Sequence, residues 1–579
     1  MILQALTELY EDLRSRGEIA GPGWSRAKVS YALCLSGSGA LLQVASLLDV
    51  TGKKPLPRDM EVPAPVKRSS GVSANFLCDN ASYLLGADGK GKPARTAECW
   101  AAAKALHLRI LAEADGPEAE ALRQFFETWD PAAAAVHPAL QAYREEILAG
   151  ANLVFRLEDS AGSRFLQDIP AIRTAWEKHY LSAGTGPEMV CLVTGEYGPV
   201  EAIHPAIKGV RGAQSSGAAL VSFNAPAFCS YGKEQNYNAP VSQYAAFAYT
   251  SALNRLIADR EHVWYIGDTA VLCWAKGAEP AYQGMLGASF LGSPGTYSQQ
   301  DILDKMERLS RGKPVEFDET RLDPERPFYV LGIAPNAARL SVRFFLRSSF
   351  GGIMEHVAAH HRRMEIVRPS YDTALTLSVW RMLNETVNQK SRDKAASPQM
   401  AGDVLRSILL GERYPATLLN GVQLRIRAEH EITRGRAAII KAYYLKNGHA
   451  DVPEEVLQVG LNRDSANTAY VLGRLFSVLE NIQSAANPGI NTTIRDRFFN
   501  GASATPAAVF PVLLNLAQKH LKKIGGGLAV VLSRELGEIM DKLPEQFPER
   551  MNLGQQGAFQ LGYYHQTQAR YQGKEKEEA

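Results

Sequence analysis

The apolar residues of this chain repeat with two different periods, and the change between the two divides the sequence near residue 370. Downstream of that point almost every segment has the apolar spacing of an amphipathic helix. These segments are residues 372–389, 398–411, 416–447, 465–486, 505–523 and 528–542, with breaks at 488–489, 503–506 and 525–527. Residues 371–579 are therefore predicted to form an all-α helical bundle.

Upstream of residue 370 the helical and strand periods alternate. Residues 2–16 place Leu6, Leu9 and Leu13 on one helical stripe that stops at Gly17, whereas residues 28–48 read as two strands around a tight turn. Further helices are predicted at 96–113, 117–128, 137–149 and 166–182, and further strands at 189–195, 217–223, 263–275 and 328–333. Residues 1–370 are therefore predicted to be an α+β region, a mixed sheet with helices and long polar loops.

Length and composition narrow the class of protein. A chain of 579 residues is too long for one ordinary core, and 46% hydrophobic with 21% charged residues is typical of globular domains. The net charge of +2 excludes a histone-like polycation. The six cysteines are scattered, and no secretory leader or membrane-spanning segment is recognised. Reduced thiols, a cytoplasmic location, and no metal or other cofactor are expected.

The segment at residues 208–240 is unusually rich in small polar side chains. Of its 33 residues, 13 are Gly, Ser, Asn or Gln, and one is acidic. Glycines let backbone N–H groups approach phosphates, amide side chains can bond to base edges, and Phe223, Phe228, Tyr231 and Tyr237 present aromatic faces. The same composition is typical of a turn-rich loop that packs on its own protein, so both interpretations stay open.

Two other segments are locally basic. Residues 336–368 hold six arginines against two acids, and residues 404–446 hold eight lysines or arginines against three acids. In the first segment, alternation predicts a strand with Arg339, Arg343 and Arg347 on one face. That face is expected either to grip a nucleic-acid backbone or to be a salt-bridged outer face of a sheet.

Two motifs resemble enzyme sites, but each lacks a necessary group. Residues 86–93 fit the phosphate-binding pattern G-x-x-x-x-G-K, yet Pro93 stands where a hydroxyl should hold magnesium. His356 and His360 have the spacing of a zinc-protease helix without its glutamate, so a partly exposed helix is the preferred interpretation. No nucleophile elbow, nuclease-type acidic cluster or helicase motif set is found, and no enzymatic activity is expected.

Several long runs of the sequence resemble one known family. The runs are GVRGAQSSGAALVSFN (209–224), FAYTSALNRLI (247–257), RSSGVSANFLCDNASYLLG (68–86), APNAARLSVRFF (334–345), GAFQLGYYHQ (557–566) and the opening MILQALTELYEDL. From Met1 to about Gln566 the chain resembles the large subunit of the type I-C CRISPR interference complex, Cascade.

The resemblance implies a non-catalytic subunit of an RNA-guided surveillance complex. Such a subunit recognises the protospacer-adjacent motif in duplex DNA, aids strand separation, holds the displaced strand and offers a docking surface to a helicase-nuclease. The implied partners are CRISPR RNA, the target duplex and its displaced strand, the backbone and handle-binding subunits, the small subunit and the helicase-nuclease. Residues from about 450 to 579 resemble the small subunit itself.

A protein that recognises the flanking motif in the narrow minor groove needs slim loops and amide side chains. Contacts with the motif are predicted for Gln214, Ser215, Ser216, Asn224, Gln235, Asn236 and Asn238, and contacts with phosphates for Lys208, Arg211 and Lys233. A second DNA contact zone is predicted at Ser69, Ser70, Asn75, Lys90 and Lys92. Contacts with RNA or displaced-strand backbone are predicted for Arg339, Arg343, Arg347, Arg406, Arg425, Arg427, Arg434 and Arg436. For each of these side chains, a structural role inside the fold is the alternative.

Two other classes of protein remain as alternatives. One is an enzyme whose glycine-rich segment cradles the phosphate of a small molecule. The other is a structural helical scaffold whose polar loop binds a protein partner.

Overall fold

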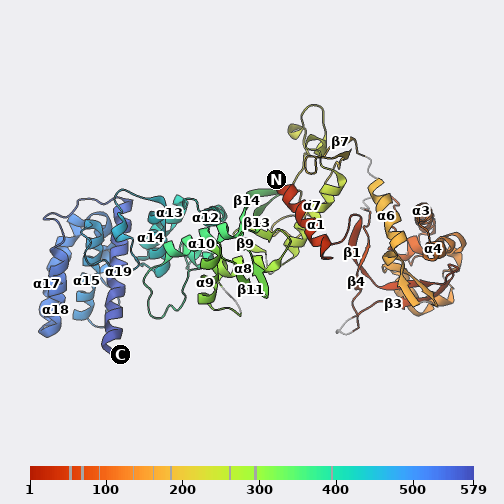
Figure 1. Cartoon of the computed structure of the whole chain (residues 1–579). Coiled ribbons are helices and arrows are strands. Elements are labelled where there is room, and N and C mark those ends of the chain that lie inside the picture. Colours follow the sequence, from red (N-terminus) through yellow and green to blue (C-terminus); the bar gives the residue numbers. More distant parts are fainter. Residues whose placement is uncertain are drawn as a thin grey trace. The chain divides into compact units, whose positions relative to one another are not determined.

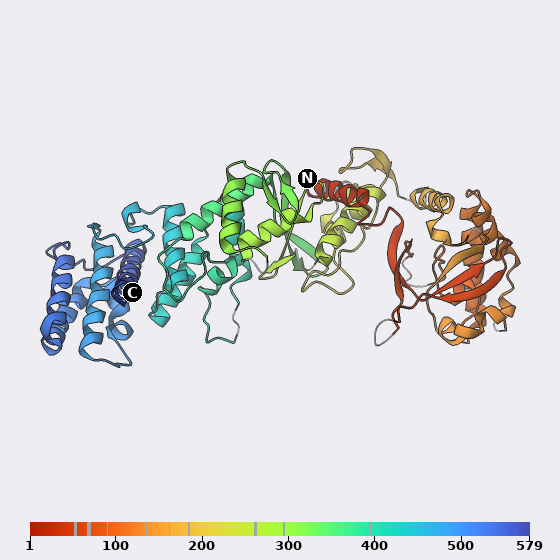
Figure 2. The ribbon, with the colours of Figure 1, turned by 60° about the horizontal axis from the view of Figure 1, so that its bottom comes forward.

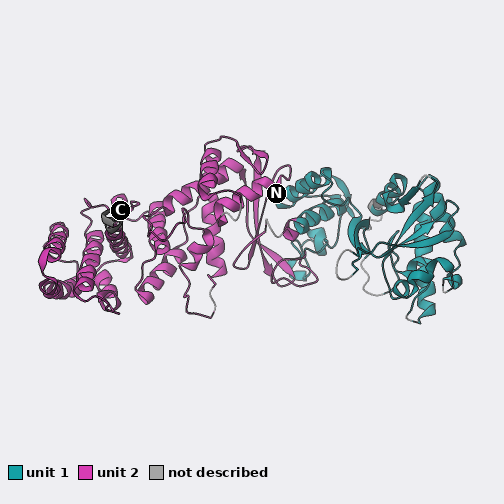
Figure 3. Ribbon diagram, turned by 90° about the horizontal axis from the view of Figure 1, so that it is seen from below, with its two compact units in different colours: residues 1–207, 219–255 teal, residues 208–218, 256–579 magenta. Residues whose placement is uncertain are grey.

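The computed structural model describes residues 1–50, 55–66, 71–89, 91–134, 136–160, 162–182, 186–259, 263–292, 296–392 and 395–578. The chain divides into two compact units (Figure 3). Unit 1 consists of Met1–Ile207 with Ala219–Arg255, and unit 2 consists of Lys208–Ala218 with Leu256–Ala579. This division does not coincide with residue 370, where the strand signal of the sequence fades.

Unit 1 begins with helix α1 (Ile2–Ser15), whose buried residues include the predicted stripe of Leu6, Leu9 and Leu13. Next comes an antiparallel ribbon of β1 (Trp24–Val29) and β4 (Arg58–Pro63). The main sheet has the order β3-β2-β5-β6, in which only the β2–β5 pair is parallel. Its strands are β2 (Tyr31–Leu35), β3 (Leu41–Ser46), β5 (Leu153–Asp159) and β6 (Gly162–Phe165). The hairpin predicted within residues 28–48 is therefore confirmed as β2–β3.

Helices pack their apolar residues against this sheet. They are α2 (Ala81–Leu84), α3 (Pro93–Leu111), α4 (Pro117–Thr128), α5 (Arg144–Leu148) and α6 (Pro170–Ser182). Leu33 and Phe155 of the sheet share one buried cluster with Trp100, Phe126 and Trp176 of the helices. The helix predicted at residues 137–149 is instead a 3-10 turn (Pro138–Tyr143) followed by α5.

The rest of unit 1 is mainly loop. It holds the small ribbon of β7 (Glu188–Val190) and β8 (Tyr197–Pro199), and then most of α7 (Gln243–Ala258). The strand predicted at residues 217–223 was wrong: Gly217, with a φ of +102°, ends a turn, and the residues after it form only isolated bridges and bends.

Unit 2 contains an antiparallel sheet of order β14-β13-β10-β9. Its strands are β9 (Trp264–Ile266), β10 (Thr269–Ala275), β13 (Pro327–Asn336) and β14 (Arg339–Ser349), and a separate ribbon is made by β11 (Val315–Phe317) and β12 (Thr320–Leu322). Helices α8 (Pro280–Leu291), α9 (Gln299–Ser310) and α10 (Phe350–Met364) accompany these strands.

After α10, every regular element that the structure describes is helical, as the sequence predicts (Figure 2). The helices are α11 (Val379–Asn384), α12 (Pro398–Leu410), α13 (Ala416–Glu429), α14 (Arg434–Asn447), α15 (Thr468–Ala486), α16 (Ile494–Ala504), α17 (Pro506–Ile524), α18 (Gly526–Met540) and α19 (Leu553–Glu578). One continuous apolar core joins the sheet to these helices. Within the described ranges, no helix combines the length and apolar character that crossing a bilayer requires.

Helices α15 and α19 lie side by side and approach each other very closely (Figure 1). A Cβ atom at Gly473 would stand 1.9 Å from the Phe559 carbonyl oxygen, and one at Gly562 would stand 2.0 Å from the Tyr470 carbonyl oxygen. Buried polar pairs flank this contact, because the Tyr470 hydroxyl lies 3.0 Å from His565 Nδ1 and Arg474 Nε donates to Gln566 Oε1 at 3.1 Å. The run GAFQLGYYHQ therefore serves helix packing.

Candidate nucleic-acid interface

The polar segment of residues 208–240 is divided between the two units. Residues 208–218 belong to unit 2, and residues 219–240 belong to unit 1. Apart from two 3-10 turns, Pro226–Phe228 and Gln235–Asn238, the segment is irregular. Its two pieces are therefore described separately.

The unit 2 piece is a pair of exposed turns. The Ala213 N–H donates to the Val210 carbonyl at 3.1 Å around Gly212, which has a φ of +83°, and Gly217 N–H donates to the Gln214 carbonyl at 2.9 Å. The Arg211 guanidinium lies 4.4 Å from the centre of the Tyr265 ring. The predicted contacts Lys208, Arg211, Gln214, Ser215 and Ser216 are all exposed here. The turns thus present basic and hydroxyl groups to solvent.

The unit 1 piece contains a sharp turn, residues 230–233, that exposes an aromatic ring. The Lys233 N–H donates to the Ser230 carbonyl at 3.0 Å, and the two central residues, Tyr231 and Gly232, have φ values of +53° and +69°. Positive φ at both central positions is the geometry of a type I′ turn, and a left-handed backbone costs a side-chain-bearing residue about 1–2 kcal/mol. The Tyr231 side chain is 99% exposed. The fold thus holds a tyrosine in a strained conformation that leaves its ring unburied.

Of the asparagines predicted to contact the motif, Asn238 instead supports this turn and Asn236 is buried. Asn238 Oδ1 accepts from the Ser230 N–H at 2.8 Å, and its Nδ2 donates to the carbonyls of Lys233 (3.1 Å) and Gln235 (2.9 Å). Asn236 is 3% exposed. In this conformation both amides face the protein, whereas Asn224, Lys233 and Gln235 are exposed.

Behind the turn lies a cavity of about 590 Å³, lined only by residues of unit 1. Phe223, Asn224, Ala225 and Lys233 contribute to its wall, and His204 lies in it at 6% exposure. His204 Nδ1 lies 2.7 Å from the Tyr249 hydroxyl, while Nε2 is buried and has no hydrogen-bond partner among the residues that the structure describes. Burial lowers the pKa of His204 to about 4, so the ring is neutral at pH 7.

The predicted second contact zone is described only in part, because Ser69, Ser70 and Lys90 lie outside the described residues. Asn75 Oδ1 accepts from the Val66 N–H at 2.9 Å, which is the turn-bracing role that its sequence context also allows. Lys92 is exposed and directly precedes Pro93, the first residue of α3. Because Pro93 has no N–H, the start of this helix lacks one of the donors of a phosphate loop.

The three arginines of β14 do not share one face. Arg339 pairs with Asn336 and Arg347 pairs with Tyr329, and a β-bulge interrupts the register at Gly332/Ile333. These partners on β13 are an odd number of residues apart, so Arg339 and Arg347 point to opposite faces, and the one-face prediction was wrong. Arg343 falls at the bulge and pairs with Asp268 at 3.1 Å, whereas Arg347 is exposed without an ion pair in the described residues.

The predicted arginines of the helices mostly have partners within the fold. Arg434 and Arg436 are buried at 5% and 4% exposure, the first beside Asp372 and the second between Glu385 and Glu429. Arg425 lies 3.6 Å from Glu429, and Arg427 Nη2 donates to Gln556 Oε1 at 2.9 Å. Arg406 is half exposed beside Glu412. Arg434 and Arg436 are therefore held as structural residues in this conformation.

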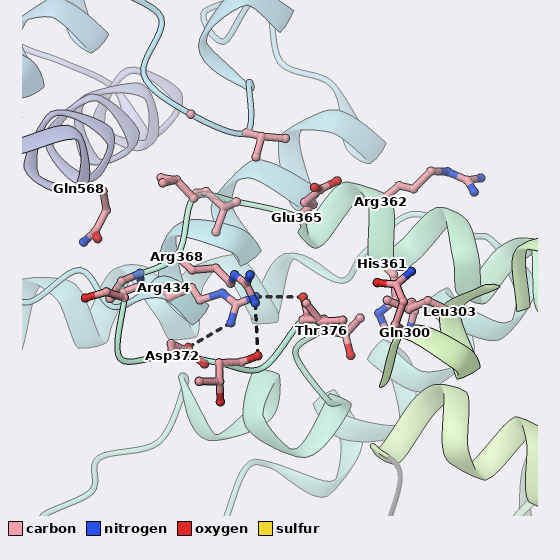
Figure 4. A pocket seen from close by; sticks show the side chains of 18 of the residues that line it. Gln300, Leu303, His361, Arg362, Glu365, Arg368, Asp372, Thr376, Arg434 and Gln568 are labelled. Carbon is pink, nitrogen blue, oxygen red and sulfur yellow. Dashed lines mark hydrogen bonds and ion pairs between the residues drawn. The ribbon is translucent and has the colours of Figure 1, made fainter. Parts of the chain in front are cut away.

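A second cavity, of about 930 Å³, lies within unit 2 around Arg434 (Figure 4). Arg434 and Arg368 both donate to the Ala374 carbonyl, at 2.7 and 3.2 Å. Burial opposes the ionised form of Asp372, but hydrogen bonds and charge from Arg381 and Arg434 outweigh it and lower its pKa to about 2. Most of the Arg434 guanidinium is thus engaged by the wall of the cavity.

The histidines of α10 point inward rather than to solvent. His356 Nδ1 lies 2.8 Å from the Leu409 carbonyl, His360 Nδ1 lies 2.6 Å from the Tyr414 hydroxyl, and His361 Nε2 lies 2.7 Å from the Ser289 carbonyl. His360 is 1% exposed, and burial together with the charges of His361 and Arg363 lowers its pKa well below the usual value. The described ranges contain no group of three His, Cys, Asp or Glu side chains that could hold a metal ion.

Sequence reasoning named Tyr231 only as one of four aromatic residues of the segment, without a role of its own, and did not single out His204. Tyr231 had a local signal, because it directly precedes a glycine in a polar segment. His204 had none, because its importance arises from the cavity that residues 219–236 close around it.

A family model described as CRISPR-associated protein (Cas_Csd1) matches residues 6–571. No curated protein matches the chain.

Proposed function

This chain belongs to the CRISPR-associated protein family Cas_Csd1, and we propose that it is the large, non-catalytic subunit of a type I-C RNA-guided surveillance complex. In this role it recognises the motif that flanks the target in duplex DNA and begins the separation of the strands. It acts with CRISPR RNA and the other subunits of the complex. A separate helicase-nuclease docks on it and performs the cutting.

The observation that carries the proposal is the strained turn of residues 230–233. The Tyr231 ring adds almost no buried apolar area to the fold, because the residue is 99% exposed, and its positive φ adds backbone strain. The stability of the isolated chain therefore gives no reason for a tyrosine at this position. A slim turn of this kind fits a groove about 6 Å wide, and an inserted ring can unstack a base step. We assign Tyr231 to the step between the flanking motif and the first target base pair.

Exposed polar groups next to this turn supply the other contacts. Lys233 is assigned to a phosphate, and Asn224 and Gln235 are assigned to base edges. Lys208, Arg211, Gln214, Ser215 and Ser216 form the second exposed set, in unit 2. Arg347 is assigned to RNA or displaced-strand backbone, whereas Asn236, Asn238, Arg434 and Arg436 are assigned to the fold.

The test is a binding assay of the reconstituted RNA-guided complex on duplexes with randomised flanking triplets, at fixed salt. The complex is assembled without this chain, with the wild-type chain, with Tyr231→Ala and with Tyr371→Ala. Tyr371 is the matched control because it is also exposed, at 87%, but lies outside the polar segment.

The wild-type and Tyr371→Ala chains are expected to confer a flank preference and strand opening, measured by permanganate reactivity of unpaired thymines. Tyr231→Ala is expected to keep duplex binding and to lose strand opening. If omission of the chain leaves flank preference and affinity unchanged, it is a scaffold or recruitment subunit and the proposal fails.

A further inference from the structure

The small hairpin of β7 and β8 in unit 1 exposes an apolar surface that has no part in the contacts assigned so far (Figure 1). Val190 lies directly opposite Tyr197 in the register of the two strands, so both side chains stand on one face of the ribbon. Val190 is 54% exposed, Tyr197 is 69% exposed, and Leu192, in the turn that joins the strands, is 68% exposed. Because a two-stranded ribbon buries little apolar area by itself, this face is left for another molecule to cover.

The hairpin is held firmly although its outer side chains are exposed. Cys191 is buried at 1% exposure, and its Sγ accepts from the Ser242 N–H at 3.2 Å. The Leu192 N–H donates to the Pro240 carbonyl at 2.9 Å. These bonds tie the hairpin to the end of the polar segment that carries the turn of residues 230–233. The apolar surface is therefore preorganised, which lowers the entropic cost of binding a partner.

The charges of the hairpin argue against nucleic acid as its partner. Residues 179–207 contain three glutamates, Glu188, Glu196 and Glu201, and no lysine or arginine. Glu188 and Glu196 are exposed and would stand against the phosphates of DNA or RNA. A second copy of the hairpin is also disfavoured, because a symmetric contact would bring the same glutamates together. The surface instead fits a protein whose apolar side chains are surrounded by lysine or arginine.

We propose that the β7–β8 hairpin is the surface on which the helicase-nuclease docks, through an apolar patch with a basic rim that covers Val190, Leu192 and Tyr197. The inference rests on the proposed function, because the helicase-nuclease enters only with it. It adds the location of the contact and the chemistry of the partner's surface. A partner docked there binds the same part of unit 1 as the turn to which strand separation is assigned, so it is placed to receive the unpaired strand.

The experiment measures how tightly a nuclease-inactive helicase-nuclease binds the full RNA-guided complex on a target duplex, by biolayer interferometry at several salt concentrations. Tyr197→Ser removes the aromatic ring of the hairpin. Leu42→Ser is the matched control, because Leu42 is a 50% exposed apolar residue of β3 in the same unit. Glu196→Lys reverses one charge of the hairpin and removes no apolar area.

Tyr197→Ser is expected to weaken binding of the helicase-nuclease about tenfold, a usual effect of truncating a central aromatic contact, whereas Leu42→Ser should bind as wild type does. Glu196→Lys is expected to weaken binding and to make it less dependent on salt, because one attraction to the basic rim is lost. All three variants should keep the flank preference and the permanganate reactivity of wild type. Thermal melting shows that unit 1 remains folded, and Glu196→Lys tests the docking surface without altering its apolar side chains.

The results that overturn the inference are distinguishable from failure of the proposed function. If folded Tyr197→Ser and Glu196→Lys bind the helicase-nuclease as tightly as wild type does, the hairpin is not its docking surface. The inference also fails if these variants instead prevent another subunit from joining the complex, because the hairpin then belongs to an internal contact. If wild type confers no flank preference at all, the proposed function itself fails.

Discussion

Replacement of Arg434 by glutamine should destabilise unit 2 without changing the contacts with nucleic acid. In the folded chain Arg434 Nη1 lies 3.1 Å from Asp372 Oδ2 and 2.7 Å from the Ala374 carbonyl, and Nη2 lies 3.2 Å from the Leu375 carbonyl. The side chains of the ion pair are 4% and 7% exposed. Breaking a buried pair costs about 3–5 kcal/mol. Because Asp372 keeps Arg381 as a partner, we expect the lower end of that range.

The loss should depend on pH in a defined direction. The pKa of Asp372 is lowered from 3.8 to about 2 in the folded chain. The ionised carboxylate therefore contributes about 2 kcal/mol above the unfolded pKa, and this contribution is lost as the pH falls through the folded pKa. Removal of Arg434 raises the folded pKa, so the stability difference between wild type and Arg434→Gln should be larger at pH 7 than at pH 3.

Urea denaturation followed by far-ultraviolet circular dichroism, at pH 7 and pH 3, measures this difference. Arg347→Gln is the control, because Arg347 is exposed. The control should keep wild-type stability. In a DNA-binding assay at several salt concentrations, it should make the negative slope of log K against log salt less steep by about 0.9, the value of one phosphate contact. A stable Arg434→Gln chain whose salt slope falls as in the control would refute the structural role of Arg434.

Three further outcomes follow from single contacts. Lys233→Gln should weaken DNA binding equally on all flanking sequences and lower the salt slope by about 0.9; a change confined to one flanking sequence would contradict the phosphate assignment. Burial lowers the pKa of His107 to about 4, so unit 1 should lose stability as the pH falls from about 6.5 to 4, because in this range the unfolded chain binds a proton at His107 and the folded chain does not. His107→Gln should flatten this part of the curve of stability against pH, and an unchanged curve would exclude His107 as its source. Gly562→Ala should lower the melting temperature, because its Cβ would stand 2.0 Å from the Tyr470 carbonyl oxygen, whereas Gly527→Ala, with open space around it, should not; equal melting of the two variants would contradict the close approach of α15 and α19.

The sequence by itself determined where most of the helices and strands lie, because that information is local; the predictions at residues 137–149 and 217–223 are the exceptions. The stripe of α1, the β2–β3 hairpin and the change to an all-helical course after residue 370 follow from apolar spacing and from turn residues. The turn-rich character of residues 208–240 was also readable, since glycine and amide side chains disfavour both regular elements, although the strand predicted within it at 217–223 was wrong. The resemblance to a CRISPR-associated protein was readable from long runs, and the family model matches residues 6–571.

Tertiary structure alone decided which side chains remain available for function. One extra residue at the β14 bulge moved Arg339 and Arg347 to opposite faces, which a period of two cannot anticipate. Carboxylates far away in the sequence, Asp372 and Glu385, pair with Arg434 and Arg436, and chain closure around His204 made a cavity from residues without a common motif. Apolar periodicity records what each residue does relative to its chain neighbours, whereas pairing and burial depend on segments that meet only when the chain has folded.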